Sequence, residues 1–247
     1  RDFIELPFEV GEVVAASADE EQFLVGRQRE RRFTGNFRRH ISIEINLNTQ
    51  NDFQSGKYSL KKNSNFELNL YQSYKNLYDN YSDNTKRNIK KAIKNNIQTE
   101  KNVSPLSVIN LFRENTGRKI KNIKDKDYHV LLQLIQECIS RGHAEVWGVF
   151  TKEKKLCAGI FWIKTDDRAI FHFSAANYEA KENGSMFLLI DTFIGEHAGK
   201  KMILDFEGSN EKNLARFYKS FGAAEHVYLQ IKKNNLPPFV KWLKKLW

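Results

Sequence analysis

Three apolar, β-prone runs that follow one another at short intervals constrain the fold more than any other feature of the sequence. They are AEVWGVF (144–150), LCAGIFWIK (156–164) and AIFHFSAA (169–176), and only TKEKK and TDDR separate them. Connections this short join antiparallel neighbours. The three runs therefore predict an antiparallel meander.

The pattern changes after the meander. Helical spacing of apolar residues over 186–199 precedes a strand pattern over 201–206, and the alternation repeats with a helix over 210–221 and a strand over 226–232. A strand that is reached through a crossover helix is normally parallel to its neighbour. We therefore expect an α/β fold whose mixed sheet combines the meander with a β-α-β-α-β unit.

Three helices are expected before the meander, over 82–96, 104–117 and 125–142. The second has Ser104 in position to cap its N-terminus and Pro105 at its first helical position. The first is amphipathic, because isoleucines recur on one side while basic residues project from the other. The basic residues are Lys86, Arg87, Lys90, Lys91 and Lys94.

The two ends of the chain give weaker signals. The run ADEEQFLVGRQRERRF (18–33) could form a helix, ISIEINLN (41–48) alternates like a half-buried strand, and 55–70 predicts a second strand. The closing PPFVKWLKKLW predicts a short amphipathic helix within 236–247. Neither end contains a repeat or a low-complexity tract.

Composition limits the class of partner. The 247 residues include 40 Lys and Arg against 30 Asp and Glu, a formal net charge of +10. This excess favours an anionic partner such as nucleic acid, a phosphate-rich cofactor or an acidic surface, although a solvated lysine face is a common alternative. The two cysteines, Cys138 and Cys157, predict buried thiols in a reducing compartment, with neither a disulfide nor a zinc site. No apolar run approaches the length of a membrane span, and we expect a cytoplasmic protein.

Tyr218 lies in the helix pattern over 210–221, at the edge of an apolar stripe made by Leu214, Phe217 and Phe221. A tyrosine in this position is often a core residue with a hydrogen-bonded hydroxyl. The alternative is a general acid, because the ordinary pKa of tyrosine, about 10, keeps the hydroxyl protonated at neutral pH. Helical periodicity alone does not choose between these interpretations.

Asp205 and Glu207 flank Phe206 at the C-terminal end of a predicted parallel strand. Ligands gather at such ends in open α/β sheets. Strand alternation places both carboxylates on one face, where either could accept a proton from an amine. The alternative is structural: Asp205 would cap or pair, and Glu207 would belong to the start of the next helix.

The segment KENGSM (181–186) precedes a predicted helix. Free N–H groups at a helix N-terminus attract phosphate, and a glycine there allows close backbone approach. An asparagine–glycine pair before a helix is otherwise an ordinary turn. The candidate phosphate-binding residues are Lys181, Asn183, Gly184 and Ser185.

The order of elements, together with A-x-x-Y-x-x-x-G at Ala215, Tyr218 and Gly222, resembles the GNAT acyltransferase superfamily. KENGSM resembles that superfamily's pyrophosphate loop, Q/R-x-x-G-x-G/A, with Lys181 at the basic position and Met186 in place of the second glycine. The resemblance implies that the tyrosine protonates the departing coenzyme A thiolate.

A second resemblance involves the basic helix. TKRNIKKAIKNN resembles the T-(K/R)-R-x-I-x-K-A-x-K run of Fem-type transferases, which pair two GNAT-like lobes and transfer aminoacyl groups from tRNA to bacterial cell-wall precursors. LDFEGS and RFYKSFGA resemble their D-F-x-G and F-K-x-x-F-G segments, with Tyr218 at the lysine position. The implied organisation is a reduced N-terminal GNAT-like lobe (1–80), a C-terminal acyltransferase lobe (81–235) and a terminal helix (236–247).

These resemblances imply an N-acyltransferase that moves an acyl group from acetyl-CoA or another acyl-CoA to an amine. Glu207 would act as the base and Tyr218 as the acid, while a backbone N–H near 174–176 would polarise the carbonyl. The residues implied to bind the coenzyme are Lys181, Asn183, Gly184, Ser185, Ala176 and Asn213. Two alternatives stay open: a Fem-like transferase that uses aminoacyl-tRNA, and an inactive GNAT-like binding module, which Met186 favours. The histidines show no metal-ligand spacing, and no metal is expected.

Overall fold

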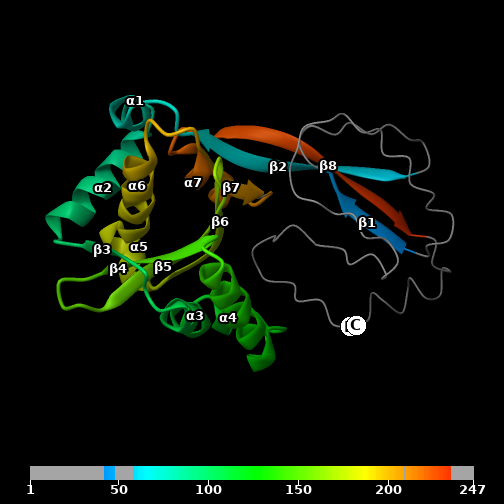
Figure 1. Ribbon diagram of the computed structural model, residues 1–247, viewed down its shortest axis with the longest axis horizontal. Coiled ribbons are helices and arrows are strands. Elements are labelled where there is room, and N and C mark those ends of the chain that lie inside the picture. The colour runs from blue at the N-terminus through cyan, green and yellow to red at the C-terminus, as the bar shows by residue number, and fades with distance from the viewer. Residues whose placement is uncertain (1–41, 48–57, 209, 235–247) are drawn as a thin grey trace. The chain divides into compact units, whose positions relative to one another are not determined.

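The computed structural model describes residues 42–47, 58–208 and 210–234, and these form two compact units (Figure 1). The larger unit contains Phe66–Glu225, and the smaller one contains the described residues before and after that range. The helices expected within 18–33 and 236–247 lie outside the described residues. The division into lobes at residues 80 and 235 stays a prediction.

The smaller unit is built on antiparallel pairing between β1 (Ser42–Asn46) and β8 (Ala224–Asn234). Ile45 pairs with Ile231, and the amide of Gln230 donates to Asn46 Oδ1 at 2.8 Å. β2 (Ser59–Asn69) lies next to β8 in the strand order and continues into the larger unit. The strands predicted over 41–48 and 55–70 are thus confirmed.

In the larger unit the strand order is β2-β7-β6-β5-β4-β3. The meander is confirmed, because neighbours from β3 to β6 pair antiparallel, and β6 then pairs with β7 in parallel. The edge strand β3 is an addition that its short polar sequence did not predict. The bounds are β3 Gln98–Lys101, β4 Ala144–Phe150, β5 Leu156–Lys164, β6 Arg168–Ala176 and β7 Ile203–Gly208.

Helices cover both faces of this sheet (Figure 1). One buried cluster joins the sheet to α1 (Tyr74–Asp79), α2 (Asp83–Lys94), α6 (Ser185–His197) and α7 (Lys212–Lys219). A second buried cluster lies under α3 (Pro105–Glu114) and α4 (Asp125–Ser140). No helix in the described part of the chain has the length and apolar content that crossing a bilayer requires.

Three details differ from the expectations. α1 was not predicted, and neither was α5 (Tyr178–Asn183), which follows the meander. Both helices are only six residues long, and helices this short depend on tertiary contacts more than on local propensity. α3 stops at Glu114, and Gly117 begins a separate 3₁₀ turn (Gly117–Lys119).

A β-bulge at His172 interrupts the pairing of β5 with β6. Phe161 pairs with Phe173 and Trp162 pairs with Phe171, so that His172 is the extra residue. An extra residue reverses the alternation of side chains beyond it. Phe171 accordingly packs in the cluster with α6 and α7, whereas Phe173 packs in the cluster with α3 and α4.

Candidate active site at the splayed strands

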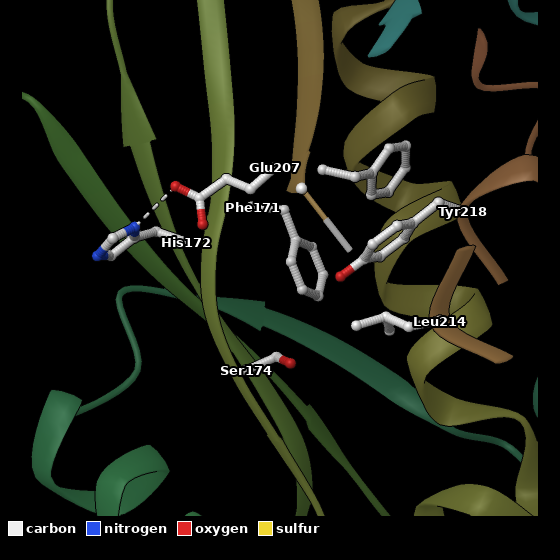
Figure 2. A pocket seen from close by; sticks show the side chains of 8 residues that line it. Phe171, His172, Ser174, Glu207, Leu214 and Tyr218 are labelled. Atoms are coloured by element: carbon white, nitrogen blue, oxygen red, sulfur yellow. Dashed lines mark hydrogen bonds and ion pairs between the residues drawn. The ribbon is translucent and has the colours of Figure 1, made fainter. Parts of the chain in front are cut away.

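The candidate site lies where two parallel strands separate. β6 and β7 pair at three positions, of which Ile170 opposite Asp205 is the last. Beyond this pair β6 runs on to Ala176 and β7 to Gly208, and a cleft opens between the strand ends and α7 (Figure 2). The lining residues are Phe171, His172, Ser174, Phe206, Glu207, Gly208, Leu214 and Tyr218. The cleft is narrow: its volume of about 20 Å³ holds about one water molecule.

Tyr218 contributes an aromatic ring to the core and a hydroxyl to the cleft. The residue is only 3% exposed, and its ring stacks on Phe206 with centroids 4.8 Å apart. The hydroxyl points into the cleft (Figure 2) and makes no hydrogen bond with any described residue. Burial, reinforced by the negative charge of Glu207, raises the pKa of this hydroxyl, which is therefore protonated at neutral pH.

Glu207 approaches the cleft from β7 and meets His172 from β6. The His172 Nδ1–H donates to Glu207 Oε1 at 3.1 Å (Figure 2). The second carboxylate oxygen has no hydrogen-bond partner among the described residues. Glu207 has a φ of +59°, in the left-handed region that residues other than glycine seldom adopt. Positive φ at a non-glycine residue is concentrated at functional sites.

His172 and Ser174 line the cleft as well, next to the expected Glu207 and Tyr218. The pairing of His172 with Glu207 could not be read from the sequence, because the two residues lie on different strands and meet through the bulge and the splay. The imidazole also packs edge-on against Phe161, with ring centroids 5.8 Å apart.

Asp205 has the structural role that was left open as the alternative. Arg168 binds its carboxylate and also reaches Glu67 Oε1 at 3.0 Å. The other Asp205 oxygen accepts the backbone N–H of Glu207 at 2.8 Å. Asp205 therefore faces Arg168 and the Glu207 backbone, and it does not line the cleft.

The residues expected to bind pyrophosphate lie at the junction of α5 and α6, and none of them lines the cleft. Gly184 has a φ of +80° and donates its N–H to Ala180, while the Ser185 N–H donates to Asn183 Oδ1 at 3.0 Å. A Cβ at position 184 would collide with the backbone oxygen of Asn88 on α2. α2 thus covers the α5–α6 junction. The N–H groups of Gly184 and Ser185 at this junction already donate hydrogen bonds within the protein.

The other expected coenzyme contacts are dispersed. Lys181 is exposed, Ala176 pairs with Ala158 at the end of β6, and Asn213 is exposed on α7, bonded to Glu211 and Arg216. Coenzyme binding by these residues stays a prediction.

The thiols and carboxylates do not form a metal centre in the described part of the chain, where no three His, Cys, Asp or Glu side chains gather. Cys157 is buried beside Ser185, with Sγ 3.2 Å from the serine Oγ, and burial raises the pKa of the thiol. Cys138, which was also expected to be buried, is only half-buried and packs against the cluster under α3 and α4. Both cysteines are free thiols.

Comparison with known proteins identifies the fold. No protein-family model and no curated protein matches the sequence. Among solved structures, FemX superposes with a TM-score of 0.53 at 12% identity, over 67% of this chain and 61% of FemX. The structure of L-PGS from Bacillus licheniformis gives a TM-score of 0.50 at 13% identity, over 76% of this chain and 65% of that one.

A tandem GNAT protein from the clavulanic acid biosynthesis pathway gives a TM-score of 0.50 at 12% identity, over 79% of this chain and 65% of that one. The chain thus spans less than two thirds of the length of these proteins. At such identities the likeness concerns the fold alone. These structures agree on that fold: the protein has a GNAT-like fold of the kind found in Fem-type transferases.

Proposed function

We propose that this protein is an N-acyltransferase that moves an acyl group from an acyl-CoA thioester to an amine within the cleft between β6, β7 and α7. One observation carries the proposal: a protonated tyrosine hydroxyl and a carboxylate with one unpaired oxygen both face the opening between two splayed strands. The first group can act on a leaving thiolate and the second on an attacking amine.

The reaction follows from these two groups. Glu207 accepts a proton from the acceptor's ammonium group, and the freed lone pair attacks the carbonyl carbon of the thioester. A backbone N–H near the end of β6 stabilises the resulting oxyanion. The second nitrogen proton passes to solvent, the carbon–sulfur bond breaks as the tetrahedral intermediate collapses, and the Tyr218 hydroxyl donates a hydrogen bond to the departing thiolate sulfur. Because thioesters are already reactive, positioning of the two substrates contributes most of the rate.

The raised pKa of Tyr218 refines its role. A thiol has an ordinary pKa of about 8.5, below that of this hydroxyl, so complete proton transfer to a free thiolate would be uphill. Tyr218 therefore acts mainly as a hydrogen-bond donor that stabilises charge as it develops on sulfur.

The test is an acyl-transfer assay with acetyl-CoA and a panel of amines, comparing the unmodified protein with Tyr218→Phe. We expect turnover to fall at least about tenfold with little change in the KM for the thioester, because the ring still packs on Phe206 while the donor is lost. Leu214→Ile, which also lines the cleft but carries no proton, is the control. Unchanged turnover in Tyr218→Phe would show that the hydroxyl has no catalytic role and that Tyr218 is only a core residue.

A second candidate is aminoacyl transfer from charged tRNA, in the manner of the Fem-type transferases. The covered α5–α6 junction favours it, because a pyrophosphate cannot reach the N–H groups of Gly184 and Ser185 while α2 is in place. The basic side of α2 is also exposed. Thermal stabilisation by charged tRNA and not by acetyl-CoA would support this candidate. Stabilisation by neither donor would favour an inactive binding module.

A further inference from the structure

The backbone of Glu207 is held in an unusual conformation at the point where β7 has separated from β6. The parallel pairing with β6 ends at Asp205, two residues earlier, so β6 does not fix the backbone of Glu207. Its φ of +59° is nevertheless in the left-handed region. A strained conformation of this kind persists only where surrounding contacts determine it.

Asp205 supplies such a contact. Its Oδ1 accepts the Glu207 N–H at 2.8 Å, which closes a tight turn of the type that aspartate side chains form with the backbone two residues later. Its Oδ2 is bound by the guanidinium of Arg168 on the neighbouring strand, and the side chain of Asp205 is only 13% exposed. One carboxylate thus connects the end of β7 to β6 and fixes the following backbone N–H.

Arg168 is itself anchored from a third strand. Besides Asp205 it contacts Glu67 of β2, with Nη1 3.0 Å from Oε1. Two carboxylates on one half-buried guanidinium leave Asp205 little freedom to rotate. The direction of Glu207 toward His172 therefore depends on contacts that lie outside the cleft.

We propose that Asp205, anchored by Arg168, is a positioning residue that holds the Glu207 backbone in its left-handed conformation and so directs the Glu207 carboxylate toward His172 and the cleft. The catalytic consequence rests on the proposed function, in which Glu207 is the base. The structural consequence does not, since it concerns only the conformation of residue 207.

A double-mutant cycle on kcat separates positioning from a general structural role. Asp205→Ala should lower kcat about tenfold or more with little change in KM, because small displacements of a reacting group are costly. Asp205→Asn keeps the Oδ1 acceptor for the Glu207 N–H but replaces the oxygen that Arg168 binds by an amide nitrogen, so it should restore only part of the activity. In a Glu207→Gln background Asp205→Ala should have no further effect. Asp166→Ala removes an exposed carboxylate from the turn before β6 and serves as the control.

A crystal structure of Asp205→Ala gives a readout that does not require activity. We expect Glu207 to leave the left-handed region and its carboxylate to separate from His172. An unchanged Glu207 would overturn the proposal whatever the assay shows, and so would an equal loss of kcat in both backgrounds. A wild-type protein inactive with every donor and amine would instead overturn the proposed function. If Asp205→Ala does not fold, Arg168→Met takes its place in both measurements, with the same expected and contrary results.

Discussion

His197 shows how a buried position fixes the protonation state of a residue. The imidazole lies on the last turn of α6, stacked on Phe193 with ring centroids 4.2 Å apart and close to Trp147. Its Nδ1–H donates to the Phe193 carbonyl at 2.8 Å. Burial lowers the pKa of His197, so the folded protein holds the neutral form. This histidine is structural, in contrast to His172 in the cleft.

The lowered pKa predicts a loss of stability in acid. Below the ordinary histidine pKa of about 6.5 the unfolded chain binds a proton that the folded protein resists, so the free energy of unfolding falls as pH decreases from 7.5 to 5.5. His197→Gln should reduce this dependence, whereas His143→Gln, at an exposed site, should leave it unchanged. Urea unfolding midpoints at both pH values measure it. Equal slopes for His197→Gln and the wild type would contradict the assignment.

At the scale of elements, the N-terminus of α2 is tied to the C-terminus of α7, the helix that carries Tyr218. Thr85 is fully buried, and its hydroxyl donates to Ser220, with Oγ–Oγ 2.8 Å and Oγ1–O 3.1 Å. The backbone N–H of Ser82 donates to the same Ser220 carbonyl at 2.9 Å. The threonine that begins the TKRNIKKAIK run thus has a structural use in this chain.

Thr85→Val should test this connection with little change in shape. The substitution removes the hydrogen bonds from Thr85 to the half-buried Ser220, whose carbonyl keeps the Ser82 N–H, and we expect the free energy of unfolding to fall by about 1 kcal/mol. Thr99→Val is a matched control on β3, because the Thr99 hydroxyl makes no hydrogen bond with any described residue. Chemical denaturation of both variants measures the difference. Equal stabilities would show that the hydroxyl contributes nothing.

At the scale of the whole molecule, the formal net charge of +10 bears on the choice of donor. Polyanion binding releases counterions and therefore weakens steeply with salt, whereas binding of a single coenzyme depends on a local site. The exposed basic side of α2 lies on the helix that also covers the α5–α6 junction. The same helix, α2, therefore carries the exposed basic residues and closes off the N–H groups of the α5–α6 junction.

If the donor is charged tRNA, reversing charge on α2 should weaken binding more than the same reversal elsewhere. We expect Lys90→Glu with Lys94→Glu to raise the Kd for tRNA about tenfold at physiological salt. Lys152→Glu with Lys155→Glu, on the exposed β4–β5 turn, changes the net charge equally and should have a smaller effect. Fluorescence anisotropy over a salt series measures both. Equal weakening by the two pairs would indicate a non-specific charge effect.

The sequence by itself determined the elements whose signals are local. The meander strands 144–150 and 156–164 have the predicted bounds, because apolar runs between short polar turns need no distant information. The GNAT-like order of strands and helices and the candidacy of Tyr218 and Glu207 followed from the same local patterns. The short elements α1, α5 and β3 were not predicted, because four to six residues carry too little periodicity to indicate a helix or a strand.

Only the tertiary structure decided how these residues meet. Burial along β6 alternates without interruption, so the bulge that re-aims His172 appears only in its register with β5. The left-handed backbone of Glu207 depends on Asp205 and Arg168, and the cover over Gly184 comes from Asn88 on α2. Periodicity reports which side of one element is buried. Contacts between residues far apart in the chain depend on strand register and helix docking, which only the packed chain fixes.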